Sequence, residues 1–403
     1  MIPCPLSSAS DTAGTPPFEE DSPMTKRLLA SALAAATLGL LTACAQPVAP
    51  RAAAPAAAPA DPLADYPPLP PAPLPGASPA ARRFAASLGR GVNFGNMLDA
   101  PAEGAWGLRV DDRYIALVGT GTSIASVRLP VRWSNHASLD AQARIDPAFM
   151  ARVDDVVQRL LARGVPVVVD MHHYRQLDGD PRDPGEAAVP DELVERRFLA
   201  MWTQIAEHFH AAPATLAFEL YNEPHGKLAP HWNDLMSRAL RVVRASNPER
   251  VVVVGPTQWN SARGLVDFTM PPDANLVLTV HHYDPFTFTH QGAPWIKPAL
   301  PQGVACCSPQ QLADIRGPLD TAQQFGARTG YPVWVGEFGA FETVPQDDRV
   351  RYTRAIRDEI ERHGMTWAYW ELAGGFGFID PATAQGRPNG IEQALFGPRA
   401  VAP

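Results

Sequence analysis

The segment VPVVVDMHH, residues 165–173, gives the clearest indication of the fold. Its first half is almost wholly apolar and rich in β-branched residues, and its second half turns polar within a few positions. A strand that is buried on both faces has such an uninterrupted apolar run, and strands of this kind belong to parallel sheets. The polar end predicts that functional side chains follow the strand.

Seven other short apolar segments share this character, and longer amphipathic segments separate them. Together with the quoted segment they predict strands at residues 91–94, 124–130, 165–171, 216–221, 251–255, 276–280, 332–336 and 366–370. The amphipathic segments predict helices at residues 147–163, 191–210, 231–246, 308–329 and 347–363. Eight β-α units over roughly 300 residues predict a single-domain (β/α)8 TIM barrel. A doubly wound open sheet is disfavoured because no Gly-x-Gly-x-x-Gly or P-loop pattern follows the first strand.

The composition limits the classes of protein that the chain can be. Its 403 residues are 46% hydrophobic, which is enough for a sizeable core and excludes a disordered protein. Lys and Arg number 34 against 42 Asp and Glu, so the net charge is −8. We expect no nucleic-acid partner, because such a partner needs a basic surface. The cysteines number only four, too few for a disulfide framework.

The N-terminal part has the pattern of a targeting segment. Residues 1–23 lack periodicity and are interpreted as an upstream extension before a true start at Met24. Residues 24–44 combine a basic start with a short apolar run, which is typical of a signal peptide. The run ends in LTAC, residues 41–44, which resembles a bacterial lipobox with Cys44 as the lipidated residue. We expect an exported cell-envelope lipoprotein anchored to a membrane through Cys44, or a secreted protein if the signal is an ordinary cleaved one.

A proline- and alanine-rich spacer is expected next. Residues 45–81 hold 12 Pro and 14 Ala in 37 positions, a composition that cannot build a core and favours a semi-rigid extended chain. The catalytic domain is then expected at residues 82–403.

Polar side chains gather where the predicted strands end, which is where a barrel carries its chemistry. They form a set of candidate site residues: Asn96, Asp99, Arg128, His172, His173, Asn222, Glu223, Trp259, His281, Tyr283, Glu337, Trp370 and Glu371. Glu223 and Glu337 are the central pair, because two carboxyl groups across a cleft can divide acid and base roles in glycoside hydrolysis. Aromatic residues near these strand ends, including Trp106 and Trp295, suit the apolar faces of sugar rings.

The motifs around both glutamates resemble those of a known family. FELYNEP at residues 218–224 is similar to the acid/base signature of glycoside hydrolase family 5, the cellulase family, and VGEFG at residues 335–339 is similar to its nucleophile strand. Further likenesses are GVNFGN at 91–96, VRLP at 127–130, DMHH at 170–173, HHY at 281–283 and WAYW at 367–370. DPFTFTHQGA at residues 284–293 resembles the bacterial endoglucanase branch. The likeness covers about residues 88–397.

The resemblance implies a retaining endo-β-1,4-glycanase, most simply an endoglucanase, that acts on a β-linked polysaccharide. Glu337 is then the nucleophile and Glu223 the acid/base, with a pKa that the nearby charge of Glu337 raises. The other implied roles follow the family motifs: Asn222 binds the sugar 2-hydroxyl, Arg128 and Tyr283 bind Glu337, His281 orients Glu223, His172, His173 and Asn96 contact the sugar, and Trp370 forms its floor. Asp99, Trp259, Trp295 and Glu371 are weaker candidates for the cleft. No cofactor or metal is implied, and a monomer is expected.

Several alternatives stay open. A β-mannanase or an enzyme of mixed specificity is the alternative within the family, and a catalytically silent glycan-binding lipoprotein is one of a different class. Glu219 shares a strand face with Glu223, and we expect it to be a buried structural residue paired with a cation, for which Arg128 is a candidate. The paired histidines at 172–173 and 281–282 could instead ligate a metal in a metal-dependent barrel hydrolase. Cys306 and Cys307 are adjacent, where a disulfide is strained, and we expect no catalytic role for them.

Overall fold

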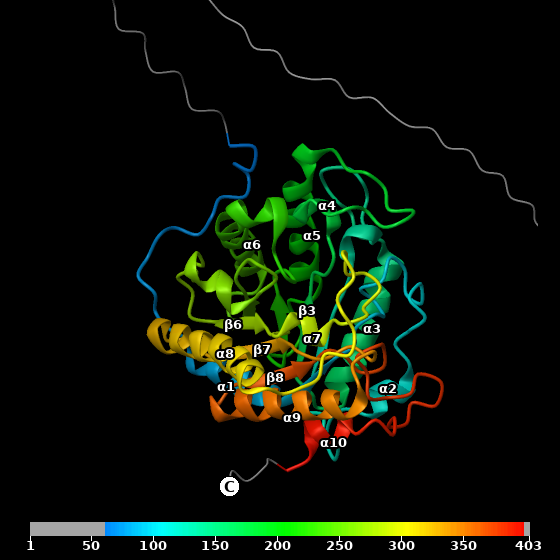
Figure 1. Cartoon of the computed structure of the whole chain (residues 1–403). Coiled ribbons are helices and arrows are strands. Elements are labelled where there is room, and N and C mark those ends of the chain that lie inside the picture. The colour runs from blue at the N-terminus through cyan, green and yellow to red at the C-terminus, as the bar shows by residue number, and fades with distance from the viewer. Residues whose placement is uncertain (1–60, 399–403) are drawn as a thin grey trace, which may run out of the picture. The chain divides into compact units, whose positions relative to one another are not determined.

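Eight parallel strands close into a barrel in chain order in the computed structural model, which describes residues 61–398 (Figure 1). The strands are β1 Arg90–Asn93, β2 Ser126–Leu129, β3 Val167–Asp170, β4 Leu216–Glu219, β5 Val252–Val254, β6 Leu276–His281, β7 Val333–Glu337 and β8 Thr366–Tyr369. Pairing of β1 with β8, with Gly91 opposite Ala368, completes the ring. The predicted TIM barrel is confirmed, and each predicted strand is present with its ends moved by a few residues.

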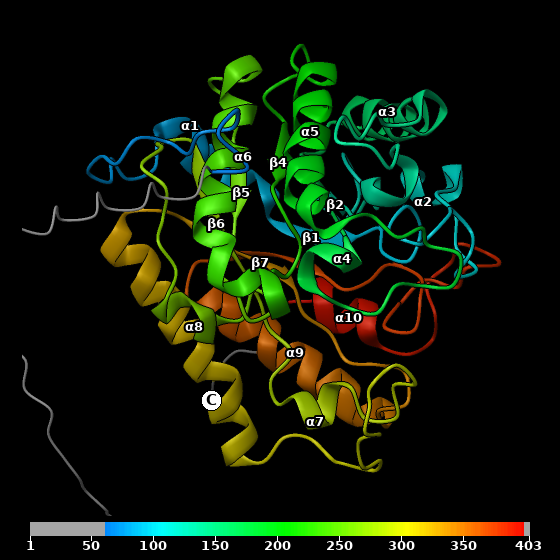
Figure 2. The same cartoon turned by 90° about the horizontal axis from the view of Figure 1, so that it is seen from above.

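Helices surround the strands, as Figure 2 shows from above. The five predicted helices are present as α3 Pro147–Ala162, α5 Asp191–His208, α6 Trp232–Ser246, α8 Pro309–Thr329 and α9 Gln346–Arg362. Shorter helices that the sequence analysis did not predict are α1 Pro79–Leu88, α2 Asp112–Ala116, α4 Arg175–Asp178, α7 Phe286–Thr289 and α10 Ile391–Phe396. Turns of 3-10 helix form η1 Trp133–His136, η2 Gly226–His231 and η3 Ala262–Val266.

The helix α1 closes the N-terminal end of the barrel. Its residues Phe84 and Leu88 belong to the same buried cluster as Val168, Val253 and Trp334 from the strands. Ser78 caps the helix by accepting a hydrogen bond from the Ala81 amide, and Pro79 follows at the first helical position, where its missing N–H has no cost. The sequence did not predict α1, because the helix begins within a proline- and alanine-rich segment that was interpreted as a spacer.

The described part of the expected spacer packs against the barrel, in contrast to a free linker. Arg238 of α6 binds Asp61 at 3.0 Å and donates to the carbonyl oxygens of Leu63 and Tyr66, and Leu63 itself is buried. We call residues 61–78 the N-terminal strap. Arg196 of α5 also binds Asp65 and donates to the Pro62 carbonyl. The strap therefore belongs to the same compact unit as the barrel, which begins before residue 82.

The remaining N-terminal expectations concern residues that the structure does not describe. The upstream extension, the signal peptide, Cys44 and the first part of the spacer all lie outside the described residues. Among residues 61–398, no helix is both long and apolar enough to cross a membrane.

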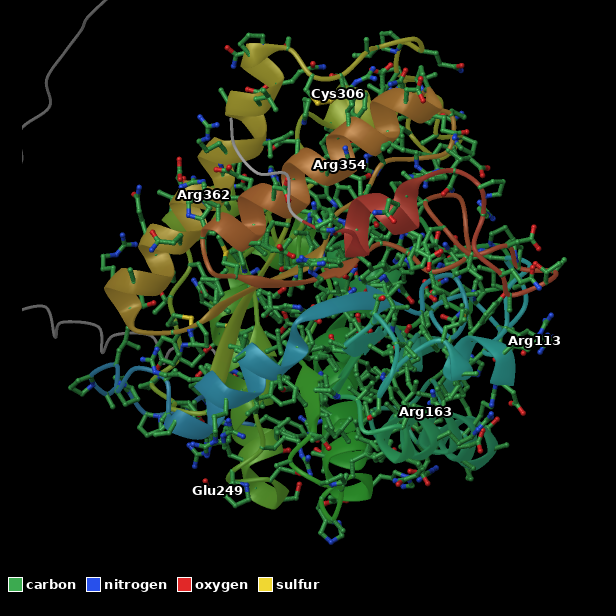
Figure 3. All side chains as sticks on the ribbon, turned by 90° about the horizontal axis from the view of Figure 1, so that it is seen from below. Arg113, Arg163, Glu249, Cys306, Arg354 and Arg362 are labelled. Atoms are coloured by element: carbon green, nitrogen blue, oxygen red, sulfur yellow. A yellow bond between two sulfur atoms is a disulfide. The ribbon has the colours of Figure 1, made fainter. Side chains whose placement is uncertain are left out.

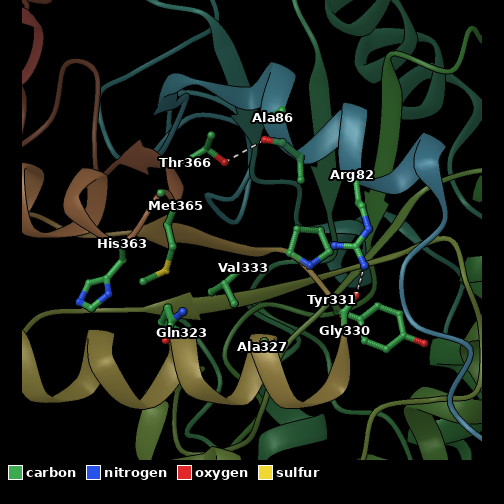
Figure 4. A pocket seen from close by; sticks show the side chains of 14 residues that line it. Arg82, Ala86, Gln323, Ala327, Gly330, Tyr331, Val333, His363, Met365 and Thr366 are labelled. Atoms are coloured by element: carbon green, nitrogen blue, oxygen red, sulfur yellow. Dashed lines mark hydrogen bonds between the residues drawn. The ribbon is translucent and has the colours of Figure 1, made fainter.

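The two ends of the barrel differ in chemistry. A cavity of about 480 Å³ lies at the end where the strands begin, between α1 and α8, and is lined by Arg82, Val333 and Thr366 among others (Figure 4). At the opposite end, the β6–β7 register shifts between Val280 and His281, so that His281 pairs with Glu337. Such an irregularity re-aims side chains at a strand end. It brings two of the candidate residues side by side.

Candidate active site

Glu223 and Glu337 meet at the C-terminal end of the barrel. Glu337 is the last residue of β7 and is buried, and Glu223 follows the end of β4. One carboxyl oxygen of each lies within 4.8 Å of an oxygen of the other, and a ring nitrogen of His281 lies within the same limit. Two carboxyl groups this close can act on the two sides of one glycosidic bond.

Arg128 of β2 is the fully buried cation of the site. Its guanidinium contacts Glu337 at 2.6 Å, Glu219 at 2.7 Å and Asp170 at 2.9 Å. Three neighbouring carboxylates raise its pKa well above the usual value, although burial alone would lower it. Glu219 is therefore the buried, cation-paired residue that the sequence predicted, and Arg128 serves both Glu219 and Glu337.

The surroundings divide the protonation states of the two glutamates. Burial raises the pKa of Glu223 to about 7, and it is burial, not the charge of Glu337 as we expected, that is the main cause. Burial also raises the pKa of Glu337 to about 7, and His281 and Arg128 oppose this rise; what distinguishes Glu337 is its direct contact with the Arg128 guanidinium at 2.6 Å and the hydrogen bond that it accepts from the Tyr283 hydroxyl at 2.8 Å. Among residues 61–398, no arginine contacts Glu223 directly. In this coupled pair the proton therefore stays on Glu223, and Glu337 carries the charge.

The supporting residues surround this pair at hydrogen-bond distance. His281 Nδ1 lies 2.8 Å from Glu223 Oε1, and because burial lowers the pKa of His281 to about 4, the ring is neutral at pH 7. Asn222 accepts a hydrogen bond from Arg128 through Oδ1 at 2.8 Å, which leaves its Nδ2 to donate. Burial also raises the pKa of Tyr283 well above its usual value, so its hydroxyl remains a donor.

Trp370 forms a flat wall beside the pair. Its ring stacks parallel to His172 at 5.6 Å, and His172 is oriented in turn by Asp170, 2.8 Å from Nδ1. A Cβ at Gly95 would lie only 2.7 Å from the Trp370 ring, so the position requires glycine. His173 lies next to His172 and meets Trp106 edge-on at 5.7 Å.

Asn96, Asp99 and Glu371 form a second acidic group next to this wall. Asn96 Nδ2 donates to Glu371, and the Asn96 amide donates to Asp99 at 3.0 Å. Burial raises the pKa of Glu371 to about 8, and the nearby charge of Asp99 adds to the rise. Burial likewise raises the pKa of Asp99 to about 7, and the charge of Asp170 adds to it. At neutral pH, the Glu371 carboxyl is therefore largely protonated and can donate a hydrogen bond.

Comparison with known proteins now identifies the family. The family model for cellulase (glycosyl hydrolase family 5) matches residues 95–375. The chain belongs to glycosyl hydrolase family 5. Endoglucanase H of Acetivibrio thermocellus is 32% identical over 294 residues, and the match covers 73% of this chain but only 30% of that protein's length. Structures of Thermotoga maritima Cel5A with mannotriose and with cellobiose are similar at a TM-score of 0.72 and 34% identity, covering 79% of this chain and 100% of that one.

Two of the weaker cleft candidates of this family 5 member are open to solvent. Trp259 is 55% exposed and stacks on His225 at 4.7 Å. Trp295 is 53% exposed and meets Phe341 edge-on at 4.9 Å. Neither ring is therefore buried in the core, and each leaves a ring face available to a ligand.

The two histidine pairs differ in whether their geometry permits metal ligation. His282 is buried and its Nε2 donates to the Ile315 carbonyl at 2.8 Å, so it faces away from His281. Asp99, His172 and His173 each place a donor atom within 4.8 Å of the others, so their geometry permits the metal alternative, which an EDTA test decides.

Adjacent Cys306 and Cys307 are joined by a disulfide, which the strain argument from the sequence disfavoured. The helix α9 holds the backbone of Cys306, because Asp348 accepts from the Cys306 amide at 2.9 Å and Arg351 donates to the Cys306 carbonyl at 3.1 Å. Figure 3 shows Cys306 at the edge of the molecule opposite Glu249.

His225 is the main residue near the site that the sequence analysis missed. It lies two positions after Glu223, its ring contacts the Glu223 carbonyl at 2.6 Å, and Trp259 covers it. Its place directly after the NEP motif at a strand end was a usable signal, because a barrel carries its chemistry at the C-terminal ends of its strands.

Proposed function

We propose that the protein is a retaining endo-β-1,4-glucanase that cleaves β-1,4-glucan by double displacement. The observation that carries the proposal is the close pair of Glu223 and Glu337 with unequal surroundings. Retaining enzymes need their two carboxyl groups about 5–5.5 Å apart, and the limit of 4.8 Å between their nearest oxygens is compatible with that spacing. An inverting enzyme needs a wider gap for a water molecule.

The residues then act in two steps. In the first step, a carboxylate oxygen of Glu337 attacks the anomeric carbon, the bond to the leaving sugar breaks, and the proton of Glu223 passes to the leaving oxygen. In the second step, Glu223 takes a proton from water, and the water oxygen displaces Glu337 from the anomeric carbon. Arg128 and Tyr283 aim the nucleophile, and His281 aims the acid/base. Nδ2 of Asn222 is available to the sugar 2-hydroxyl.

Mannan is the alternative substrate. Glucose and mannose differ at the 2-hydroxyl, so groups beside the cleavage position, such as Asn96, Asp99 and His173, decide between them. The similar Thermotoga maritima enzyme has been crystallised with both mannotriose and cellobiose. That pair of complexes supports mixed specificity as the second candidate.

The test is reducing-sugar release by the purified chain on a soluble β-1,4-glucan and on a β-mannan, with Glu337→Ala as the blank. Release from glucan alone is expected. Release from mannan, alone or as well, would favour the second candidate. No release above the blank from either polymer, combined with binding to one of them, would favour a silent glycan-binding protein. Loss of activity in EDTA would favour the metal-dependent alternative.

We also propose that the protein is exported and anchored in the cell envelope through a lipid on Cys44. The lipobox-like LTAC at residues 41–44 and the proline-rich segment after it support this location. Cys44→Ala is expected to release the protein from the membrane fraction. Membrane pelleting that persists in this variant would contradict the anchor.

A further inference from the structure

His225 sits in a charged cluster just behind the acid/base residue. Its Nδ1 lies 2.6 Å from the backbone oxygen of Glu223, and its Nε2 lies 3.3 Å from Asp180 Oδ2. A carbonyl oxygen and a carboxylate oxygen can only accept hydrogen bonds, so both ring nitrogens must carry a hydrogen to satisfy these contacts. The ring is therefore an imidazolium.

The segment after β3 supplies the negative charge that balances this cation. Asp178, the last residue of α4, accepts a hydrogen bond from the His225 amide at 3.2 Å and one from the Tyr221 hydroxyl. Two aspartates face the His225 ring from the α4 side, Asp178 and Asp180, and Arg175 lies behind Asp180. Glu223 is the titratable group that faces His225 from the β4 side. Burial opposes the charge, but the two aspartates outweigh it and raise the pKa of His225 to about 9.

The backbone at Glu223 needs this support. Glu223 has a φ of 54°, in the left-handed region that a residue with a side chain adopts at a cost. Gly226, three positions later, is also left-handed, and a Cβ there would lie 2.2 Å from the Asp178 carbonyl oxygen. The loop that presents Glu223 is thus pressed onto the α4 side, with the His225 side chain bonded to its strained residue.

We propose that His225 is a positioning residue for Glu223: its imidazolium, held by Asp178 and Asp180, fixes the Glu223 backbone and places a positive charge beside the acid/base. This role depends on one part of the proposed function, namely that Glu223 is the acid/base. His281 cannot supply the same charge, because it is neutral at pH 7. Trp259 covers the imidazolium at 4.7 Å and shields it from water, an arrangement in which an aromatic face favours a cation.

The charge has a defined effect on Glu223. A neighbouring cation favours the ionised carboxylate, so it lowers the pKa that burial raises. The result is an acid that releases its proton near neutral pH. Removal of the cation should keep Glu223 protonated to higher pH.

The decisive variant is His225→Asn, whose side-chain amide can still donate to the Glu223 carbonyl but carries no charge. The matched control is His210→Asn, because the exposed ring of His210 makes a similar contact with the Glu207 carbonyl at 2.7 Å, away from the site. The Glu223 carboxyl is followed by ¹³C NMR against pH in the full chain, with its signal assigned by Glu223→Gln. We expect its midpoint to rise by about one pH unit in His225→Asn and to stay unchanged in His210→Asn.

Kinetics supply a second readout. With a soluble β-1,4-glucan, the alkaline limb of kcat/KM should move to higher pH in His225→Asn by a similar amount. With a dinitrophenyl β-cellobioside, whose leaving group needs no proton, that shift should be absent. His225→Leu also loses the contact with the Glu223 carbonyl and should lose about tenfold more in kcat/KM on the glucan.

An unchanged carboxyl midpoint in His225→Asn would overturn the inference, and so would equal losses on both substrates without a shift. If His225→Asn does not fold, Asp180→Asn, at a partly exposed position, provides the same test by weakening the cation, and its expected shift has the same sign. A chain that hydrolyses neither substrate would contradict the proposed function, whereas the carboxyl titration would still decide the role of His225.

Discussion

Arg128 on β2 binds Glu337 on β7 at 2.6 Å, although these strands are not neighbours in the barrel. The same guanidinium also holds Glu219 and Asp170. A single buried cation therefore connects Glu337, the proposed nucleophile, to the carboxylates of two further strands. The contacts that orient Glu337 are the same ones that balance charge in the interior of the barrel.

Arg128→Lys should therefore reduce both activity and stability. One ammonium group cannot satisfy three carboxylates, and breaking a buried ion pair typically costs about 3–5 kcal/mol in the free energy of unfolding. Urea unfolding and kcat on a soluble glucan measure the two effects. Arg113→Lys, at an exposed pair with Asp111, is the control and should change little. Stability at the wild-type level in Arg128→Lys would contradict the assigned role of the cation.

Glu223→Ala should separate the two chemical steps. With a dinitrophenyl glycoside the first step needs no acid, so a burst of dinitrophenolate should still form. Attack by water on the glycosyl-enzyme should then stall, because general base assistance contributes about 10²–10⁴-fold. Stopped-flow absorbance measures both phases. An equal loss in the burst for polysaccharide-like and activated substrates would count against Glu223 as the acid/base.

The sequence predicted the parts of the molecule that repeat or that carry a motif. Buried parallel strands are visible as valine runs, and Glu223, Glu337 and Arg128 stand at strand ends within family motifs. The sequence did not predict contacts that depend on how distant segments meet. The contact of Arg128 with Asp170 as a third carboxylate and the contacts of His225 with Asp178 and Asp180 are of this kind, because they depend on how the strands and their loops come together.

The N-terminal strap shows how composition can mislead. Its prolines and alanines predicted a semi-rigid extended spacer, because such residues cannot build a core of their own. A few residues within it nevertheless find partners on the barrel surface, among them Asp61, Leu63 and Tyr66. Composition describes the average of a segment, and a docking contact depends on single side chains.

Leu63→Ala should therefore destabilise the catalytic domain. Leu63 is 5% exposed, and truncation of a buried leucine typically costs about 2–5 kcal/mol. We expect a value near the lower end, because the strap lies on the outside of the barrel and can relax. Thermal unfolding measures the change, with Leu74→Ala, at an exposed position of the same strap, as the control. Equal melting temperatures for the two variants would show that the strap is not an integral part of the domain.

Glu371 should make stability depend on pH in a direction opposite to that of a typical carboxylate. Burial and the neighbouring Asp99 raise the folded-state pKa of Glu371 to about 8, whereas an unfolded glutamate titrates near ~4.3. Between these values the folded state binds the extra proton and the unfolded state does not. The free energy of unfolding must therefore fall as the pH rises through this window, by up to about 1.4 kcal/mol per pH unit.

Glu371→Gln removes this titration, because the amide is neutral at every pH and its oxygen can still accept from Asn96. The variant should match the wild type near pH 4 and should become progressively more stable than the wild type from pH 5 to pH 8. Asp178, whose pKa burial also raises to about 7, contributes equally to both proteins, whereas Asp99 is coupled to Glu371, so the difference between the two curves reports Glu371 together with its interaction with Asp99. Urea unfolding across this range measures it, with Glu249→Gln at an exposed position as the control (Figure 3). Parallel curves for Glu371→Gln and the wild type would mean that Glu371 is already ionised in the folded protein. It could then not donate a hydrogen bond to a sugar beside Trp370.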